Sequence, residues 1–240
     1  NNLANVNTTG FKKSRVNFQD LMYETITPAG AQTNNGVTLP EPVQVGHGSR
    51  PSAIAKLFTP GAAIQTGQPL DLYIEGDGFF QIELADGTIA YTRDGSFKIN
   101  QNGTVLTADG NPLSPQITIP NDAEQIFVSA DGNISVRVPG QNSPQPVGQL
   151  TLVRFANNPG LDARLGRNLL LETDASGPPQ EGTPGLDGLG NIAQGFLENS
   201  NVQTVEEILQ LIVAQRAYEA NARVITTSDE MLQEVNNVKR

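Results

Sequence analysis

The clearest hydrophobic pattern lies near the C-terminus, in VEEILQLIVAQRAYEANARVITTSDEMLQEV (residues 205–235), where Leu211, Tyr218, Ile225 and Leu232 recur every seven residues. A heptad repeat of this length is typical of a helix that packs along one face against another helix. Thr204 and Glu207 have the spacing of a capping box, so we expect a helix over 204–239, about 54 Å long.

Two interpretations of this helix differ in what its apolar face contacts. Placing Leu211 at heptad position d puts Ile208, Gln215, Ala222 and Asp229 at position a, so one row is apolar and the other is half polar. The helix could lie on the core of a neighbouring domain, as amphipathic helices often do. We favour a coiled coil with another helix, because the seven-residue period persists for more than three heptads and polar a positions set register.

The middle of the chain has the two-residue alternation of short strands. Asp-Gly or Asn-Gly pairs separate most of these segments and tolerate the positive φ angles of type I′ hairpin turns. The sequence therefore predicts an α+β protein with a β-rich central domain of short antiparallel strands, as a sandwich or partial barrel, and terminal α-helices that form a coiled coil. The segments are 71–76, 78–84, 88–93, 96–101, 104–108, 125–129, 133–138 and 148–155.

The N-terminal quarter is less regular. Residues 1–6 are compatible with the last turns of a helix, 11–27 have mixed helical and extended character, and 28–51 carry four Pro and four Gly, which favours an extended or loop-like segment. We expect a discontinuous assembly domain from 1–60 and 190–240, and a β-rich outer domain from 61–189.

Composition excludes several kinds of partner and site. The formal net charge is −10, so nucleic acid and anionic membranes would repel the chain, and the cluster Lys12, Lys13 and Arg15 is predicted to be a solvated face. The chain has no cysteine and no apolar run long enough to span a membrane, which argues against thiol chemistry and membrane insertion.

No arrangement of residues predicts catalysis or a cofactor. The single histidine, His47, lies between two glycines without an evident nucleophile to activate, and the aspartates that precede glycine are accounted for as turn formers. Lys98 occupies the first ligand position of the one stretch with calcium-loop spacing, and GLDGLG (185–190) is not a dinucleotide-binding motif. We therefore expect no enzyme activity, cofactor or metal.

Two terminal motifs resemble those of the flagellar rod and hook proteins. NNLANVNTTGFK (1–12) is similar to the family's N-terminal signature, and AQRAYEANARVITTSDEML (214–232) to its C-terminal signature. EGDGFFQI (75–82) and AYTRDGSFKINQNGTVLTADGNPL (90–113) resemble the shared β core. Within the family, residues 21–51, GTPGLDG (182–188) and NSNV (199–202) resemble segments of the distal rod members.

This resemblance implies a structural subunit of the distal rod that polymerises helically into a hollow drive shaft, carrying torque from the motor to the hook. Its partners would be copies of itself, the proximal rod and hook proteins, and the P- and L-ring bushing, in a basal body supplied by flagellar type III export. The helix that precedes residue 1 in the family would pair with the C-terminal helix. Alternatives are a proximal rod or hook paralogue, or a carbohydrate-binding, adhesin-like β module.

The expected assembly interface combines the two terminal motifs with the heptad face. Its residues are Asn2, Leu3, Asn5, Gly10, Phe11, Ile208, Leu211, Gln215, Arg216, Tyr218, Asn221, Ala222, Ile225 and Leu232.

Overall fold

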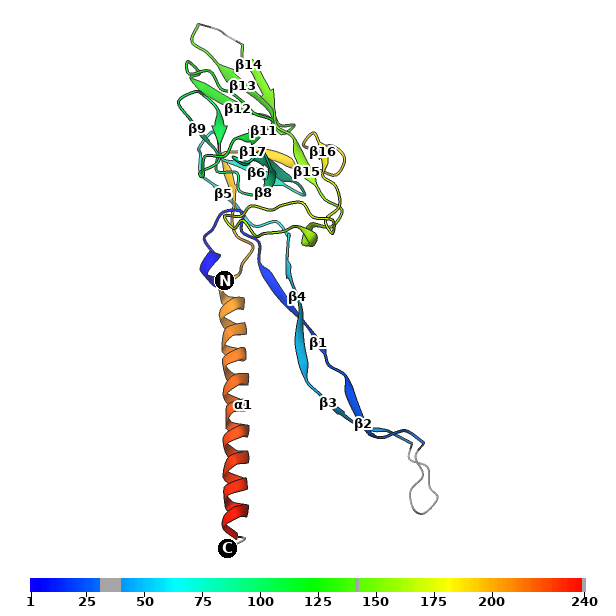
Figure 1. The fold of residues 1–240 in the computed structure, drawn as a ribbon. Helices are drawn as coiled ribbons and strands as arrows, with labels where there is room; N and C mark the ends of the chain where they lie inside the picture. The colour runs from blue at the N-terminus through cyan, green and yellow to red at the C-terminus, as the bar shows by residue number, and fades with distance from the viewer. Residues whose placement is uncertain (31–39, 141–142, 239–240) are drawn as a thin grey trace. The chain divides into compact units, whose positions relative to one another are not determined.

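The computed structural model describes residues 1–30, 40–140 and 143–238 (Figure 1). The chain divides into two compact units, which we call the β unit (residues 1–12 and 59–240) and the ribbon unit (residues 13–58). The predicted division into an assembly domain and an outer domain concerns the assembled state and remains a prediction.

The ribbon unit consists of two antiparallel strand pairs. β1 (Ser14–Asp20) pairs with β4 (Ser49–Lys56), and β2 (Tyr23–Thr27) pairs with β3 (Val43–Gly46). For 11–27 we expected mixed helical and extended character. The helical part was wrong and the extended part is confirmed, because β-branched and aromatic residues there are paired with strands distant along the chain. Part of 28–51, which we expected to be extended or loop-like, is strand, while residues 31–39 lie outside the described residues.

The β unit contains the remaining strands, and its described strands are all antiparallel (Figure 1). Each predicted strand segment overlaps an observed strand, except that 148–155 is divided between β14 and β15. The strands are β5 (Ala63–Gln65), β6 (Leu72–Glu75), β7 (Phe79–Glu83), β8 (Ile89–Thr92), β9 (Lys98–Ile99), β10 (Val105–Leu106), β11 (Leu113–Ser114), β12 (Gln125–Val128), β13 (Asn133–Arg137), β14 (Gln145–Gln149), β15 (Leu152–Arg154), β16 (Gln180–Gly182), β17 (Asn191–Gln194) and β18 (Phe196–Glu198).

Several small sheets share one hydrophobic core. The largest has the order β11-β7-β15-β16, with β8 also paired to β7, and a three-stranded sheet has the order β12-β13-β14. Phe80 of β7 packs edge-on against Phe97 with ring centroids 5.1 Å apart, and Phe79 and Tyr91 both pack against Phe155. Strands β17 and β18 connect this core to the C-terminal helix through their pairing with β6 and β5.

Four hairpin loops share one geometry, which differs from the predicted type I′ turn. In each five-residue stretch the first N–H donates to the fifth carbonyl, and the glycine N–H donates to the first carbonyl. Only the glycine has positive φ, 79–87°, whereas the preceding Asp or Asn does not. This is a three-residue loop closed by a left-handed glycine, because Asp and Asn need not adopt that strained region when glycine does. The stretches are 84–88, 100–104, 107–111 and 129–133.

The predicted C-terminal helix is confirmed. α1 (Thr204–Val238) has 35 residues and is therefore about 52 Å long. Near the N-terminus, η1 (Leu3–Asn5) is a single 3₁₀ turn in place of the α-helical turns expected for residues 1–6, and η2 (Asn158–Gly160) is a second short turn. Among the described residues, no helix combines the length and apolar character that crossing a membrane requires. The terminal coiled coil remains a prediction.

Candidate functional site

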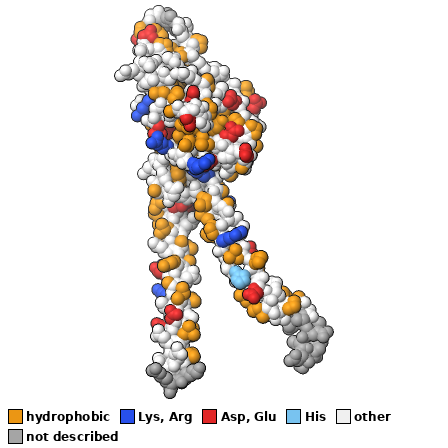
Figure 2. Space-filling model, viewed as in Figure 1, with side chains coloured by type: hydrophobic (Ala, Val, Ile, Leu, Met, Phe, Trp, Pro, Cys, Tyr) orange, Lys and Arg blue, Asp and Glu red, His pale blue; other side chains and the backbone are white. Residues whose placement is uncertain are grey.

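The predicted heptad face of α1 is uncovered within the described chain. The exposed fractions are 48% for Leu211, 77% for Tyr218, 63% for Ile225 and 64% for Leu232, and Figure 2 shows hydrophobic side chains along the helix surface. Burial of each aliphatic side chain in this row would stabilise a complex by roughly 1.5–3 kcal/mol. The face is therefore a large unused source of binding energy.

The other predicted helix residues also lie at the surface. Ile208 is 44% exposed, and the polar or small side chains of the set are exposed along the same helix. The heptad arrangement places Gln215 and Ala222 in the row beside Leu211, and Arg216 and Asn221 outside those two rows. The exposed set is Gln215, Arg216, Asn221 and Ala222.

The first turns of α1 carry apolar residues that the heptad pattern alone did not select. Val205, Leu209, Ile212 and Val213 are 40–71% exposed and lie outside rows a and d. Together with Ile208 and Leu211 they make the helix apolar around most of its circumference. Glu206, Glu207 and Gln210 occupy the remaining face, so residues 205–213 widen the candidate surface beyond a single row without surrounding the helix.

The N-terminal motif contacts the first turn of α1. Asn2 Nδ2 donates to Glu207 Oε2 at 3.1 Å, while Leu3 in η1 is 40% exposed. Asn5 Nδ2 donates to the carbonyl of Asn1 at 3.0 Å, and Thr8 donates to Asn5 Oδ1 at 3.2 Å, which fixes the loop that precedes Gly10. The structure thus brings together the two ends of the chain that the sequence analysis assigned to one interface.

Gly10 and Phe11 pack this N-terminal segment against the β unit. Phe11 is 6% exposed, and the Gly10 N–H donates to the Glu198 carbonyl at 2.9 Å. Gly10 has φ +67°, and a Cβ there would lie 2.7 Å from the backbone nitrogen of Asp94. Glycine is required here both by the left-handed backbone and by the close approach of another chain segment.

A buried charge cluster lies beneath Gly10 and joins both terminal segments to the β unit. Lys12 Nζ is 2.5 Å from Glu198 Oε1, and Arg93 Nη1 is 3.6 Å from Glu198 Oε2. Their side chains are only 1–3% exposed. We call these three residues the junction cluster; Lys12 ends the N-terminal signature, Arg93 follows β8, and Glu198 ends β18 just before α1.

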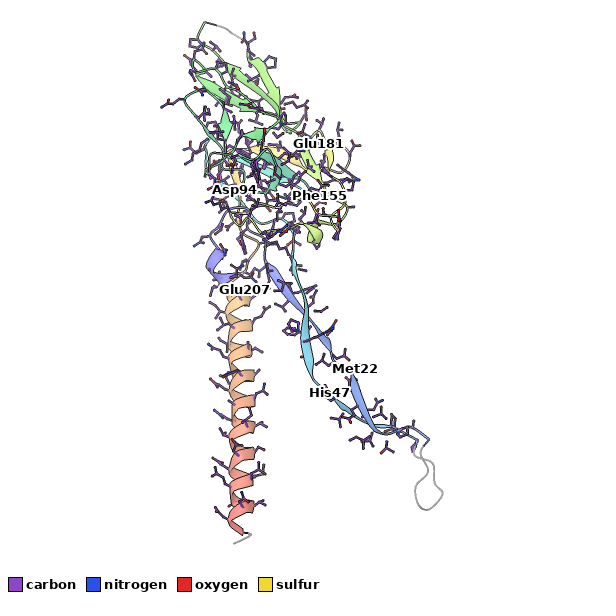
Figure 3. All side chains as sticks on the ribbon, viewed as in Figure 1. Met22, His47, Asp94, Phe155, Glu181 and Glu207 are labelled. Atoms are coloured by element: carbon purple, nitrogen blue, oxygen red, sulfur yellow. The ribbon has the colours of Figure 1, made fainter. Side chains whose placement is uncertain are left out.

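Backbone groups complete the junction cluster. Lys12 also donates to the Thr59 carbonyl at 2.8 Å, the Gly61 N–H donates to Glu198 Oε1 at 2.8 Å, and Arg93 Nη2 donates to the Gly76 carbonyl at 2.7 Å. Outside the cluster, Thr9 donates to Asp94 Oδ1 at 3.1 Å; Figure 3 labels Asp94 among the strands of the β unit and Glu207 at the start of α1. These bonds position residues 8–12 and 198–201 together.

Electrostatics make the three charges mutually dependent. Burial lowers the pKa of Lys12 below its ordinary value, and the Glu198 carboxylate partly offsets that effect. Burial likewise lowers the pKa of Arg93, with Glu198 again opposing the change. A buried charge is stable only when a partner compensates its lost hydration, so Glu198 allows both cations to be buried.

Sequence reasoning missed this cluster and misjudged one member. Lys12 was predicted to lie on a solvated face with Lys13 and Arg15, and that prediction was wrong, because Lys12 is 4% exposed and ion-paired. Its place directly after Gly10 and Phe11, within the N-terminal motif, was the available signal. Nothing in the local patterns around Arg93 or Glu198 indicated that these residues meet.

Family models match two parts of the chain. Residues 73–136 match the flagellar hook protein FlgE/F/G D1 domain, and residues 193–238 match the C-terminal part of flagellar basal body rod FlgEFG proteins. The second match contains half of β17 and all of β18 and α1, so it includes Glu198 and the exposed helix face.

Relatives cover nearly all of the chain. It is 50% identical over 238 residues to the flagellar basal-body rod protein FlgG of Buchnera aphidicola subsp. Acyrthosiphon pisum, covering 99% of the chain and 91% of the relative. The Bacillus subtilis FlgG is 44% identical, covering 100% and 91%. In Caulobacter vibrioides, FlgG is 46% identical with coverage of 100% and 91%, whereas FlgF is 37% identical with coverage of 96% and 86%. This difference favours FlgG over its paralogue, and the chain belongs to the FlgG family of flagellar basal-body rod proteins.

Proposed function

We propose that the chain is a structural subunit of the distal rod which polymerises through α1 into a helical, hollow shaft that carries torque from the motor to the hook. Its family places it in the flagellar basal body. The observation that carries the proposal is the row Leu211, Tyr218, Ile225 and Leu232, which is 48–77% exposed along a helix of 35 residues. Heterologous contacts that do not close into a ring generate filaments of this kind.

Rows a and d of α1, which we call the seam, contain polar and apolar residues with separate roles. The d row supplies burial, and Gln215 and Asp229 in the a row set the register of the neighbouring helix. Residues 205–213 contact more than one neighbour, because their apolar side chains cover more than half of the helix circumference. Asn2, Leu3 and Asn5 extend the interface at the base of α1.

The junction cluster acts in assembly by fixing where α1 begins. Glu198 ends β18, six residues before the helix, and forms ion pairs with Lys12 and Arg93 on two other segments of the β unit. Rigid supporting contacts of this kind hold a binding element near its productive geometry. We assign it a structural role and no catalytic activity.

The ribbon unit supplies further contacts between subunits. Its exposed apolar side chains include Val16 at 44%, Phe18 at 68%, Ile54 at 71% and Met22 at 84%. An isolated two-stranded ribbon is marginally stable in water, so contacts that cover these side chains would stabilise it. Residues 28–51 would stiffen the tube through such contacts, although 31–39 lie outside the described residues. The proximal rod, the hook and the P- and L-ring bushing are the proposed neighbours, and flagellar type III export is the proposed route.

A carbohydrate-binding β module has less support. Sugar-binding surfaces present aromatic rings. Among the described residues of the β unit outside α1, Phe127 is the single aromatic side chain among the exposed large hydrophobics. One exposed ring does not make such a surface.

Assembly and motility test the proposal. The chain is expressed in a motile bacterium from which its own FlgG gene has been deleted, and swimming and isolated basal bodies are examined. Restored rods with the wild-type chain, lost when the d row is disrupted, support the function. Restored swimming with a disrupted d row would contradict it, as would saturable glycan binding by a chain that does not self-associate.

A further inference from the structure

A groove of about 450 Å³ lies on the β unit, away from the residues assigned to assembly. Its apolar walls come from Ile89, Leu171 and Pro179, and its polar groups come from Tyr91, Glu172 and Glu181. The groove forms where Leu170 pairs with Tyr91 of β8 and where β16 begins. Figure 3 labels Glu181, which belongs to β16, and Figure 2 shows acidic side chains gathered on that flank.

Tyr91 presents a polar group that the described part of the chain does not satisfy. Its residue is 3% exposed, and its ring packs edge-on against Phe155 at 4.8 Å, which holds it in place. Within the described chain, its backbone pairs with Leu170, but its hydroxyl forms no hydrogen bond. The hydroxyl lines the groove and no other described residue bonds to it, so it is available to a ligand group there.

The two carboxylates at the groove are also uncompensated. Glu172 and Glu181 are exposed, and neither forms an ion pair or side-chain hydrogen bond with another described residue. Together with burial, which is the larger cause, their negative charges raise the pKa of Tyr91 to about 12. A single hydroxyl and two carboxylates therefore face a shared space with a negative potential.

We propose that this groove binds an arginine or lysine side chain presented by another protein. The ammonium or guanidinium group would pair with Glu172 and Glu181 and donate to the Tyr91 hydroxyl, while its aliphatic stem lies on Ile89, Leu171 and Pro179. A second copy of the chain is a poor source, because 25 acidic residues outnumber 15 basic ones and the net charge is −10. The partner is accordingly a more basic protein.

The test is a chemical-shift titration of the full chain with the blocked peptide acetyl-Gly-Arg-Gly-amide. We expect saturable shifts confined to residues 88–91, 171–172 and 179–181, with a fall in the pKa of Tyr91 because the bound cation favours phenolate. The peptide with citrulline in place of arginine has the same shape without the charge. Equal binding of the citrulline peptide would overturn the proposal.

Matched variants separate the site from general electrostatics. Glu172→Gln with Glu181→Gln should weaken peptide binding about tenfold. Asp122→Asn with Glu124→Gln removes the same charge from the segment just before β12 and should leave binding unchanged, and Tyr91→Phe should weaken it while retaining the ring. Equal weakening by both double variants, or shifts spread over the whole surface, would show general attraction and refute the groove.

A measurement of self-association tests whether a second copy of the chain occupies the groove instead. If Glu172→Gln with Glu181→Gln abolishes self-association in sedimentation and the peptide does not bind, the groove takes a second copy and the proposal is wrong. The peptide test does not depend on rod assembly, so a chain that fails to polymerise can still support or contradict this site.

Discussion

Helix α1 and strand β7 are both rich in apolar side chains, but they expose them to very different extents. Phe79, Phe80 and Ile82 of β7 are at most 1% exposed, whereas Leu211 and Ile225 of α1 are 48% and 63% exposed. The buried strand side chains stabilise the fold of one chain, and those of the helix can only contribute once another molecule covers them. We propose that this difference separates residues that determine stability from residues that determine assembly.

The largest expected effect comes from charging the exposed row. Leu211→Asp with Ile225→Asp should abolish rod formation and swimming, because about 3 kcal/mol or more of burial per subunit is lost and two charges enter the seam. Thermal unfolding of the β unit should not change. Electron microscopy of basal bodies and calorimetry of the purified chain measure the two effects.

The matched control for that pair is Ala220→Asp with Thr227→Asp. These residues lie at heptad position f, opposite the d row, so the added charge is equal while the seam is intact. If both pairs block assembly equally, the assignment of the seam is wrong.

Among the buried residues, substitutions in the junction cluster should cause the largest loss of stability. Glu198→Gln leaves Lys12 and Arg93 buried without their anion, and the free energy of unfolding should fall by about 3–5 kcal/mol. Lys12→Met should cost less, since Arg93 remains beside Glu198. Urea unfolding measures both values, and a larger loss for Lys12→Met would show that Glu198 is not the centre of the cluster.

A smaller effect is expected from the backbone beneath the N-terminal motif. Gly10→Ala places a Cβ at φ +67° and 2.7 Å from a backbone nitrogen. The free energy of unfolding should therefore fall by more than about 2 kcal/mol, because left-handed strain and a backbone clash add together. Urea unfolding measures this loss.

The control for Gly10 is Gly87→Ala, in an open turn. Gly87 has φ +79° and nothing within 4 Å of the added Cβ. The substitution should cost only the left-handed strain of about 1–2 kcal/mol. Similar losses for the two variants would show that close packing at Gly10 contributes little.

The smallest effect concerns pH. The pKa of Tyr91 is raised from 10.0 to about 12, so the folded state keeps its proton where the unfolded chain has lost it. The resulting stabilisation is fully present below pH 10 and is lost as the pH rises through about 12. Stability measured across this range should decline less in Tyr91→Phe, and ultraviolet titration should show one phenol ionising later than the exposed Tyr218.

The helix and strands could be predicted because their signals are local. The heptad of α1 and the alternation of β7 and β8 are spacings along the chain, and both follow from how side chains project from regular backbone. The turns show the limit of such signals, since Asp-Gly pairs predicted a turn but not its type. Glycine alone takes the left-handed angle there, at 84–88 and three similar loops.

The candidate site was predictable only in part, for the same reason. The exposed row of α1 and the N-terminal motif each lie within one short stretch of sequence. The junction cluster instead unites residues 12, 93 and 198, which are far apart along the chain. The pairing of β1 with β4 likewise joins distant segments and changed the interpretation of 11–27. Long-range contacts depend on which segments the core brings together, and residue spacing does not encode that.

The sequence by itself determined the long C-terminal helix, the strand-rich middle and the glycine turns, because local backbone preferences and periodicity specify them. Only the tertiary structure decided that Lys12 is buried, that Glu198 joins both terminal segments to the β unit, and that Tyr91 shares a groove with two glutamates. Burial and charge pairing depend on where a residue lies in three dimensions. The sequence alone therefore does not distinguish a lysine on a solvated face from a lysine beside its counterion.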